Sequence, residues 1–181
     1  MKPHEYMKEI FLAFKKRDGK KLRKLNESIL REASLVYSKK FYWLAVIAYV
    51  LSKILGKPRF MERKYYEHMN RMQSDLEKLA NCQAECTEEE FQQHFTKLVS
   101  SIKSIEAQDQ RFLTDLLTKG KLKVAATLYA QGISLGTASE ITGIEKQEIL
   151  SYAGHTMMFD RIREERGLKD RMAALRRLLE G

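Results

Sequence analysis

Residues 122–153, LKVAATLYAQGISLGTASEITGIEKQEILSYA, decide the fold of the C-terminal part of this chain. The spacing of their apolar side chains predicts a helix, a turn at residues 132–134, a short helix that ends at Gly143, and a second short helix. Glycine suits the tight turn between two short helices because it accepts a positive φ. This order of elements is that of a helix-turn-helix. The small and apolar contacts that the motif needs would come from Ser139, Ile144, Ile149 and Tyr152.

The same segment resembles a family of small prokaryotic helix-turn-helix proteins that are often described as antitoxin-like. The resemblance rests on Gly132-Ile-Ser-Leu-Gly-Thr-Ala-Ser-Glu-Ile-Thr-Gly-Ile144 followed by Glu148-Ile-Leu150, so it is limited to residues 132–150 of the 181. It implies DNA binding through the second short helix, and a toxin as a protein partner. Glu145 departs from the family pattern, which has a helix-capping Ser at that position.

The second short helix carries side chains that can contact DNA. In the predicted register its exposed residues are Glu145, Lys146, Gln147, Leu150 and Ser151. Gln147 can pair with an adenine edge, Lys146 with guanine or a phosphate, and Ser151 with a phosphate. Residues 121–153 carry three lysines and three acidic residues, so other residues must supply further phosphate contacts. We expect these from the basic N-terminal helices, from Lys121 and Lys123, and from the tail residues Arg161, Arg163, Arg166, Arg176 and Arg177.

The positive charge of the chain is concentrated in its first third. The net charge is +9, and residues 1–73 hold 18 Lys and Arg against 7 Asp and Glu. Residues 74–119 hold 5 against 9, and residues 120–181 hold 10 against 8. Clustered lysines and arginines release counterions from phosphates, which predicts contact with a polyanion at the N-terminal end. The alternative is a solvated basic surface without a partner.

Helical periodicity extends over nearly the whole chain, which has only two prolines. Amphipathic helices are predicted at 7–14, 22–36, 61–79, 91–105 and 108–117, with breaks at Lys15–Gly19 and Lys119–Gly120. The tail from Met157 to Leu179 is predicted as one long helix, and no segment has the pattern of a strand. We therefore predict an all-α fold: a basic multi-helix bundle over residues 1–120, and a C-terminal helix-turn-helix with a long terminal helix over residues 121–181. The alternative is that the two parts form one compact domain.

Residues 41–51, FYWLAVIAYVL, are apolar on every face. Eleven apolar residues in a row are too few for the roughly 20 that a membrane-spanning helix needs. We predict a central buried helix that ends at Gly56-Lys57-Pro58, with an interfacial helix as the alternative because lysines flank it.

No pattern of catalytic or cofactor-binding residues competes with this interpretation. The chain has no phosphate-binding glycine loop and no H-E-x-x-H, so we expect neither an enzyme nor a cofactor. Cys82, Cys86, His94 and His68 could in principle hold zinc, but their spacing is not that of a zinc knuckle. We expect two free thiols and no metal. Two cysteines make no disulfide framework and no cleavable signal is visible, so we expect a cytoplasmic protein without a membrane partner.

The sequence thus favours a DNA-binding regulator of prokaryotic transcription that acts as a homodimer, because helix-turn-helix dimers usually read two-fold operators. A dimer contact would come from the stripe Leu168, Met172, Leu175 and Leu179. One alternative is a helical module that binds a protein partner without nucleic acid. The other is RNA binding by the basic N-terminal helices.

Overall fold

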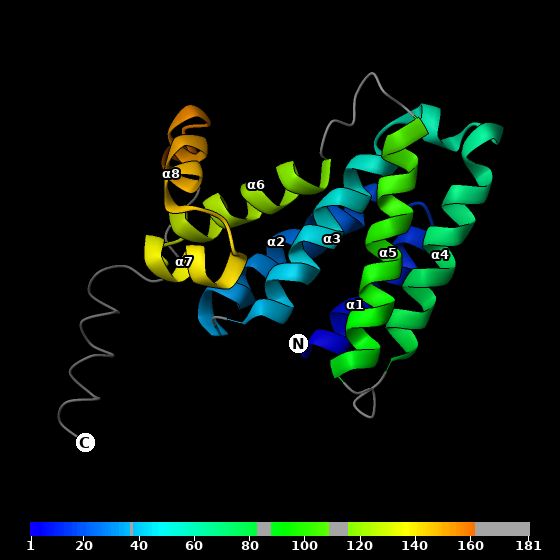
Figure 1. The fold of residues 1–181 in the computed structure, drawn as a ribbon, viewed down its shortest axis with the longest axis horizontal. Helices are drawn as coiled ribbons and strands as arrows, with labels where there is room; N and C mark the ends of the chain where they lie inside the picture. The colour runs from blue at the N-terminus through cyan, green and yellow to red at the C-terminus, as the bar shows by residue number, and fades with distance from the viewer. Residues whose placement is uncertain (37, 83–87, 109–115, 162–181) are drawn as a thin grey trace. The chain divides into compact units, whose positions relative to one another are not determined.

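The computed structural model describes residues 1–36, 38–82, 88–108 and 116–161 (Figure 1). All regular elements in these ranges are helical and none is a strand, which confirms the predicted all-α fold. Two of them, η1 and η2, are short 3-10 helices. The elements are α1 (Pro3–Lys15), α2 (Gly19–Val36), α3 (Lys39–Leu55), η1 (Pro58–Met61), η2 (Arg63–Tyr65), α4 (Tyr66–Asn81), α5 (Glu88–Gln108), α6 (Leu116–Ala130), α7 (Leu135–Thr142), α8 (Lys146–His155) and α9 (Met158–Arg161).

The chain divides into two compact units. The first unit comprises residues 1–29 and 43–120, and the second comprises residues 30–42 and 121–181. The end of α2 and the start of α3 therefore belong to the second unit, although they lie far from its other residues in the sequence. The predicted boundary at residue 120 agrees with this division, but the sequence does not predict that residues 30–42 belong to the second unit.

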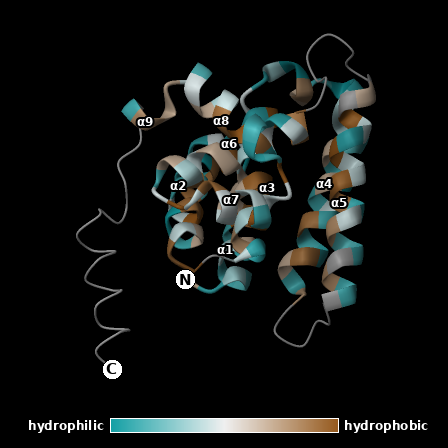
Figure 2. Ribbon diagram, turned by 60° about the vertical axis from the view of Figure 1, so that its left-hand side comes forward, coloured by the Kyte–Doolittle hydropathy of each residue, from teal (hydrophilic) through white to brown (hydrophobic). Residues whose placement is uncertain are grey.

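In the first unit, α4 packs along α5, and α1 packs along α4 (Figure 1). The hydropathy colours alternate along α4 and α5, as expected for amphipathic helices with one apolar side (Figure 2). Met72 and Leu76 of α4 and Leu98 and Ile102 of α5 are fully buried. The apolar stripes that predicted these helices therefore form their core.

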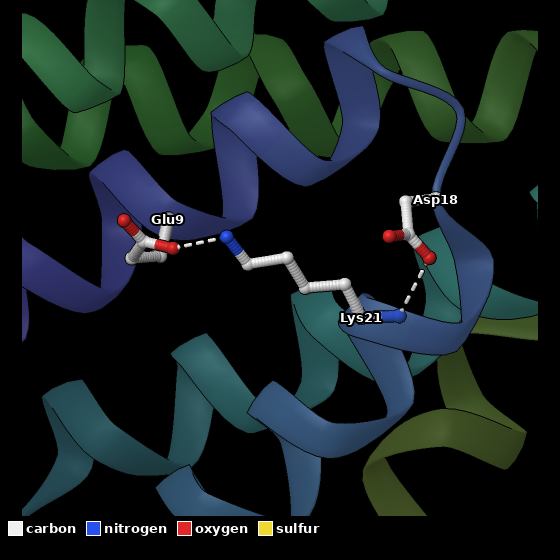
Figure 3. Close-up of polar contacts among 3 residues, drawn as sticks. All are labelled: Glu9, Asp18 and Lys21. Atoms are coloured by element: carbon white, nitrogen blue, oxygen red, sulfur yellow. Dashed lines mark hydrogen bonds and ion pairs between the residues drawn. The ribbon is translucent and has the colours of Figure 1, made fainter.

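The turn between α1 and α2 follows from a capping interaction. Arg17 has a positive φ of 56°, and the Asp18 carboxylate accepts a hydrogen bond of 2.8 Å from the Lys21 backbone N–H. The Lys21 side chain forms an ion pair with Glu9 of α1 (Figure 3). An Asp at this position satisfies a backbone donor that the first turn of a helix leaves without a partner. The predicted break at Lys15–Gly19 is confirmed.

Helix α3 is the most hydrophobic element of the structure. Val46, Ile47, Val50 and Leu51 are all buried, as the apolar run predicts, and the helix ends at Leu55. Among the described residues, no helix combines the length and the hydrophobicity needed to cross a bilayer. The prediction of a buried helix is confirmed.

Gly120 lies within α6, so the predicted helix end at Lys119–Gly120 is wrong. A Cβ atom at Gly120 would lie 2.9 Å from Cγ2 of Val50, which is closer than side chains tolerate. The glycine therefore allows α6 to approach α3 closely. A glycine near an expected helix end can mark a C-terminal cap, but it can also be needed where two helices pack closely, as it is here.

The helix predicted from residue 61 begins later than expected, at Tyr66. Residues 58–65 instead form η1 and η2, and Pro58 occupies the first turn of η1. The periodicity is misleading here because a 3-10 turn places residues three apart on one side, much as an α-helix does. Met61 is exposed rather than part of the core.

Cys82, at the C-terminal end of α4, is disulfide-bonded, so the prediction of two free thiols is wrong. Cys86 lies outside the described residues. Disulfide formation depends on geometry in three dimensions and on the redox compartment. The spacing of two cysteines in the sequence shows neither their geometry in the fold nor the redox compartment.

Candidate nucleic-acid interface

The turn between α6 and α7 is built by one glycine and one capping serine. Gly132 has a φ of 97°, which glycine adopts without strain. Ile133 is buried, and Ser134 caps α7 by accepting a hydrogen bond of 3.1 Å from the Thr137 N–H. The turn predicted at residues 132–134 is thus present.

The turn between α7 and α8 centres on Gly143, which is left-handed with a φ of 69°. Its N–H donates to the Ser139 carbonyl at 2.8 Å, and the Ser139 hydroxyl donates to the Ile144 carbonyl at 2.7 Å. Thr142 adds a second link, because its hydroxyl accepts from the Ile144 N–H at 3.3 Å. The sequence predicts Ser139 only as a small residue. Its hydroxyl closes the turn through a bond that alanine cannot make.

Helix α8 packs on α7 and is anchored along one side. Ile149 and Ala153 are fully buried, and Tyr152 is half-buried. Burial raises the pKa of the Tyr152 hydroxyl because the phenolate would lose its hydration. These three residues fix which side of α8 faces the solvent.

The opposite side of α8 carries two of the residues that the sequence singled out. Gln147 and Ser151 are exposed there beside Leu150, whereas Lys146, three residues before the buried Ile149, is exposed in the first turn of the helix. Gly154 is exposed on the same side, and nothing lies within 4 Å of the position where its Cβ would be. Side chains three and four residues apart share a helix face. On this face the backbone at Gly154 is therefore uncovered, next to the polar side chains of Gln147 and Ser151.

His155 ends this face with a defined orientation. Its Nδ1 lies 2.7 Å from the Ser151 carbonyl oxygen, which can only accept a hydrogen bond. Nδ1 therefore carries a proton in this arrangement.

A shallow groove of about 430 Å³ lies along one flank of the exposed face. Its lining is mostly apolar, and it is formed by Leu122, Gln147, Glu148, Ser151, Tyr152 and His155. Sequence reasoning misses the groove because Leu122 comes from α6, far before α8 in the sequence. The helical periodicity predicts which side of its own helix each of Leu122 and Tyr152 occupies. It does not predict that the two helices contact each other.

Of the other predicted DNA contacts in residues 121–181, two lie on α6 and the rest have side chains outside the described part of the chain. Lys121 and Lys123 of α6 are half-buried. Arg161 ends α9, but its side chain and all residues after it are outside the described part of the chain, including Arg163, Arg166, Arg176 and Arg177. Acidic Glu145 and Glu148 are exposed on α8 beside Lys146. The charge on α8 itself is therefore not positive.

The predicted tail helix begins at Met158, after Met157 with a positive φ of 48°. Phe159 of α9 meets Tyr129 of α6 edge to face, with 5.1 Å between ring centroids. The first turn of the tail thus contacts α6. The remainder of the predicted long helix, including the stripe Leu168, Met172, Leu175 and Leu179, lies outside the described residues.

A cluster of Ser, His and Asp residues between α4 and α5 does not have the order of a catalytic triad. The Ser104 hydroxyl donates to the Ser101 carbonyl at 2.8 Å, and it lies 3.0 Å from Nδ1 of His68. Its proton is thus engaged with the backbone rather than with the histidine. The Asp75 carboxylate accepts from the Ser101 hydroxyl at 2.6 Å instead of orienting His68. These bonds link two packed helices and do not activate a nucleophile.

Comparisons of the chain with protein-family models, curated proteins and solved structures found no match. The resemblance of residues 132–150 to antitoxin-like proteins therefore stays a prediction. The function of the chain has to be inferred from the geometry of α6, α7 and α8.

Proposed function

We propose that the protein binds duplex DNA through α8, as a regulator of prokaryotic transcription. One observation carries this proposal. Helix α8 follows a left-handed glycine turn, is anchored by Ile149 and Ala153, and leaves Gln147 and Ser151 exposed on the opposite face, with Lys146 exposed in its first turn. A helix held in this way can enter a major groove without disturbing the core that holds it.

The exposed side chains have the chemistry of base recognition. The Gln147 amide can form two hydrogen bonds to adenine, and Lys146 can donate to guanine or to a phosphate. Ser151 can donate to a phosphate. Gly154 adds no side chain on this side, so the helix backbone can approach the DNA closely.

Phosphate contacts must compensate for Glu145 and Glu148. The second unit also contains Arg31, Lys39 and Lys40, which are exposed and belong to the basic N-terminal segment from which phosphate contacts are expected. Together with the net charge of +9, they give the protein the positive charge that attracts a polyanion. A carboxylate on a reading helix can also select a base, because it accepts a hydrogen bond from the cytosine amino group.

The resemblance to antitoxin-like proteins extends this proposal to a homodimer and to a toxin partner. A two-fold dimer would place two copies of α8 about one helical turn of DNA apart, roughly 34 Å. The sequence stripe from Leu168 to Leu179 supplies apolar residues for such a contact. Sedimentation equilibrium of the full chain tests the dimer directly, and a monomer at high concentration would contradict it.

Fluorescence anisotropy with labelled duplex DNA tests binding. We expect affinity to fall by roughly 10³-fold between 50 and 200 mM salt if about six phosphates are contacted. Gln147→Ala should weaken binding to a preferred sequence by about 1–3 kcal/mol and leave thermal stability unchanged, because the side chain is exposed.

Gln93→Ala on α5 is the matched control, since Gln93 is also an exposed helical glutamine. It should change neither stability nor DNA binding. Absence of binding at low salt would refute the proposal. Equal losses in Gln147→Ala and Gln93→Ala would exclude α8 as the contact.

A second function, binding of a protein partner, is favoured by the apolar surface near α8. Leu150, Met157 and Phe159 are exposed, and the groove along α8 is lined mostly by apolar atoms. Exposed apolar surface that gathers into a patch marks protein contacts. A protein that binds no DNA at low salt, yet loses a partner when Leu150 is replaced by Asp, would support this function instead.

A further inference from the structure

One end of the first unit brings together four helix ends. There α1 ends, α2 begins, α3 ends and α4 begins. A Cβ at Gly19 would lie 3.5 Å from Cβ of Leu55, which places the start of α2 against the end of α3. Helix α4 contacts both η1 and η2, and the Arg17 guanidinium lies near the Tyr66 hydroxyl at the start of α4. We call this region the basic end.

The basic end is dense in cations. Its sequence segments, 15–20 and 53–67, hold nine basic residues and three acidic ones. Most of the basic side chains are exposed. The nine are Lys15, Lys16, Arg17, Lys20, Lys53, Lys57, Arg59, Arg63 and Lys64.

Two of the three carboxylates at this end have defined partners. Asp18 is engaged with the Lys21 backbone as the cap of α2. Glu62 forms an ion pair of 3.3 Å with Lys64, in which both side chains are more than half exposed. Such exposed pairs are weak and are readily exchanged for a stronger anion.

Aromatic rings hold several of these cations in place. Arg17 lies over the Phe14 ring at 5.0 Å from its centroid, and Lys64 lies over Tyr65 at 5.0 Å. Arg59 lies over Phe60 at the same distance. A cation that is already positioned loses less conformational entropy when it binds a phosphate.

Tyr66 differs from the other aromatic residues at this end because it is 61% exposed. It lies in the first turn of α4, beside Arg17 and after the cations of η2. An exposed ring among cations is the arrangement by which proteins bind unpaired bases, since the ring stacks on the base and the cations contact the phosphates. In a duplex the base faces are already stacked and offer no such surface.

We propose that the basic end binds single-stranded nucleic acid, with an unpaired base stacked on Tyr66 and phosphates held by Arg17 and its neighbouring lysines. This surface lies in the first unit and is independent of α8. A membrane surface fits less well. The large exposed side chains here with apolar surface, Met61 and Tyr66, belong to two different elements, whereas interfacial helices insert a continuous apolar face.

The test uses the full chain and a fluorescein-labelled oligothymidylate at low salt. Tyr66→Ala should weaken binding by about 5- to 150-fold, the range for loss of one stacked base. Tyr66→Phe keeps the ring and should bind within about twofold of the wild type. Because Tyr66 is exposed, both variants should keep the wild-type circular dichroism and melting temperature.

A second pair of variants separates stacking from charge. Arg17→Gln should reduce the salt dependence of binding as well as the affinity, because a phosphate contact is lost. Tyr66→Ala should reduce affinity while leaving the salt dependence unchanged, and it should not alter duplex binding.

Three results would overturn the proposal. The first is wild-type affinity for oligothymidylate in Tyr66→Ala, and the second is an equal loss in Tyr66→Phe and Tyr66→Ala. The third is binding to phosphatidylserine vesicles without binding to oligothymidylate, which would assign the basic end to a lipid surface.

Discussion

Helices α3 and α8 differ in how they are held. Nearly every side chain of α3 between Leu44 and Ile54 is buried, whereas α8 has only two fully buried residues, Ile149 and Ala153. Substitution on α3 therefore disturbs packing at almost any position. On α8 the exposed residues can be substituted without disturbing the packing of Ile149 and Ala153. A helix that binds a ligand through one face needs this separation.

The largest effect is expected in α3. Leu51→Ala should lower the free energy of unfolding by about 4 kcal/mol, because Leu51 is fully buried and its removal leaves a cavity. Leu12→Ala, at a leucine that is 40% exposed on α1, is the control and should cost less than about 1 kcal/mol. Urea denaturation measures both. Similar losses in the two variants would show that burial does not decide these costs.

Within α8, Ile149→Ala should cost about 3 kcal/mol, since it removes a buried anchor. The cost is expected to be smaller than for Leu51 because a short helix near the surface can relax toward the cavity. The adjacent Leu150→Ala is a matched control, because Leu150 is 44% exposed and should change stability by about 0.5 kcal/mol or less. If the two neighbours have equal costs, α8 is not anchored as described.

The contrast also shows which parts of the fold could be predicted from sequence. The buried helix and the break at Lys15–Gly19 are predictable because they depend on local hydrophobicity and turn-forming residues. The continuation of α6 through Gly120 is not, because the need for glycine there comes from the close approach of Val50, where a Cβ would lie only 2.9 Å from Cγ2, and only the fold creates that approach. The late start of α4 escapes prediction because 3-10 and α-helical spacings differ little over one turn.

The candidate site divides in the same way. The exposed positions of Lys146, Gln147 and Ser151 follow from the helical period once Gly143 fixes the turn. The groove beside them requires α6 to meet α8, which no local pattern reports. The hydrogen bond from Ser139 to Ile144 could not be predicted either. A serine in a sequence can be required for its small size or for its hydroxyl group, and the sequence alone does not distinguish the two roles.

A smaller effect is expected at the turn that orients α8. Gly143→Ala should cost about 1–2 kcal/mol, because its φ of 69° is strained for a residue with a Cβ. Nothing lies within 4 Å of that Cβ position, so the cost reports backbone strain alone. Gly143→Asn should be less destabilising, since asparagine tolerates this conformation. Thermal melts of the two variants measure the difference, and an alanine as stable as glycine would contradict the left-handed turn.

The smallest change in stability, at Gly154, tests the central proposal that the exposed face of α8 binds duplex DNA. Gly154→Ala should stabilise the protein by up to about 1 kcal/mol, because alanine favours the helix and nothing lies where its methyl group would go. The same methyl group should weaken duplex binding at least about fivefold, because crowding a closely fitted contact costs about 1–3 kcal/mol. Melting temperature and duplex anisotropy are measured on one preparation. A higher melting temperature with weaker binding is the predicted result, and a higher melting temperature with unchanged binding would contradict a DNA contact at this face.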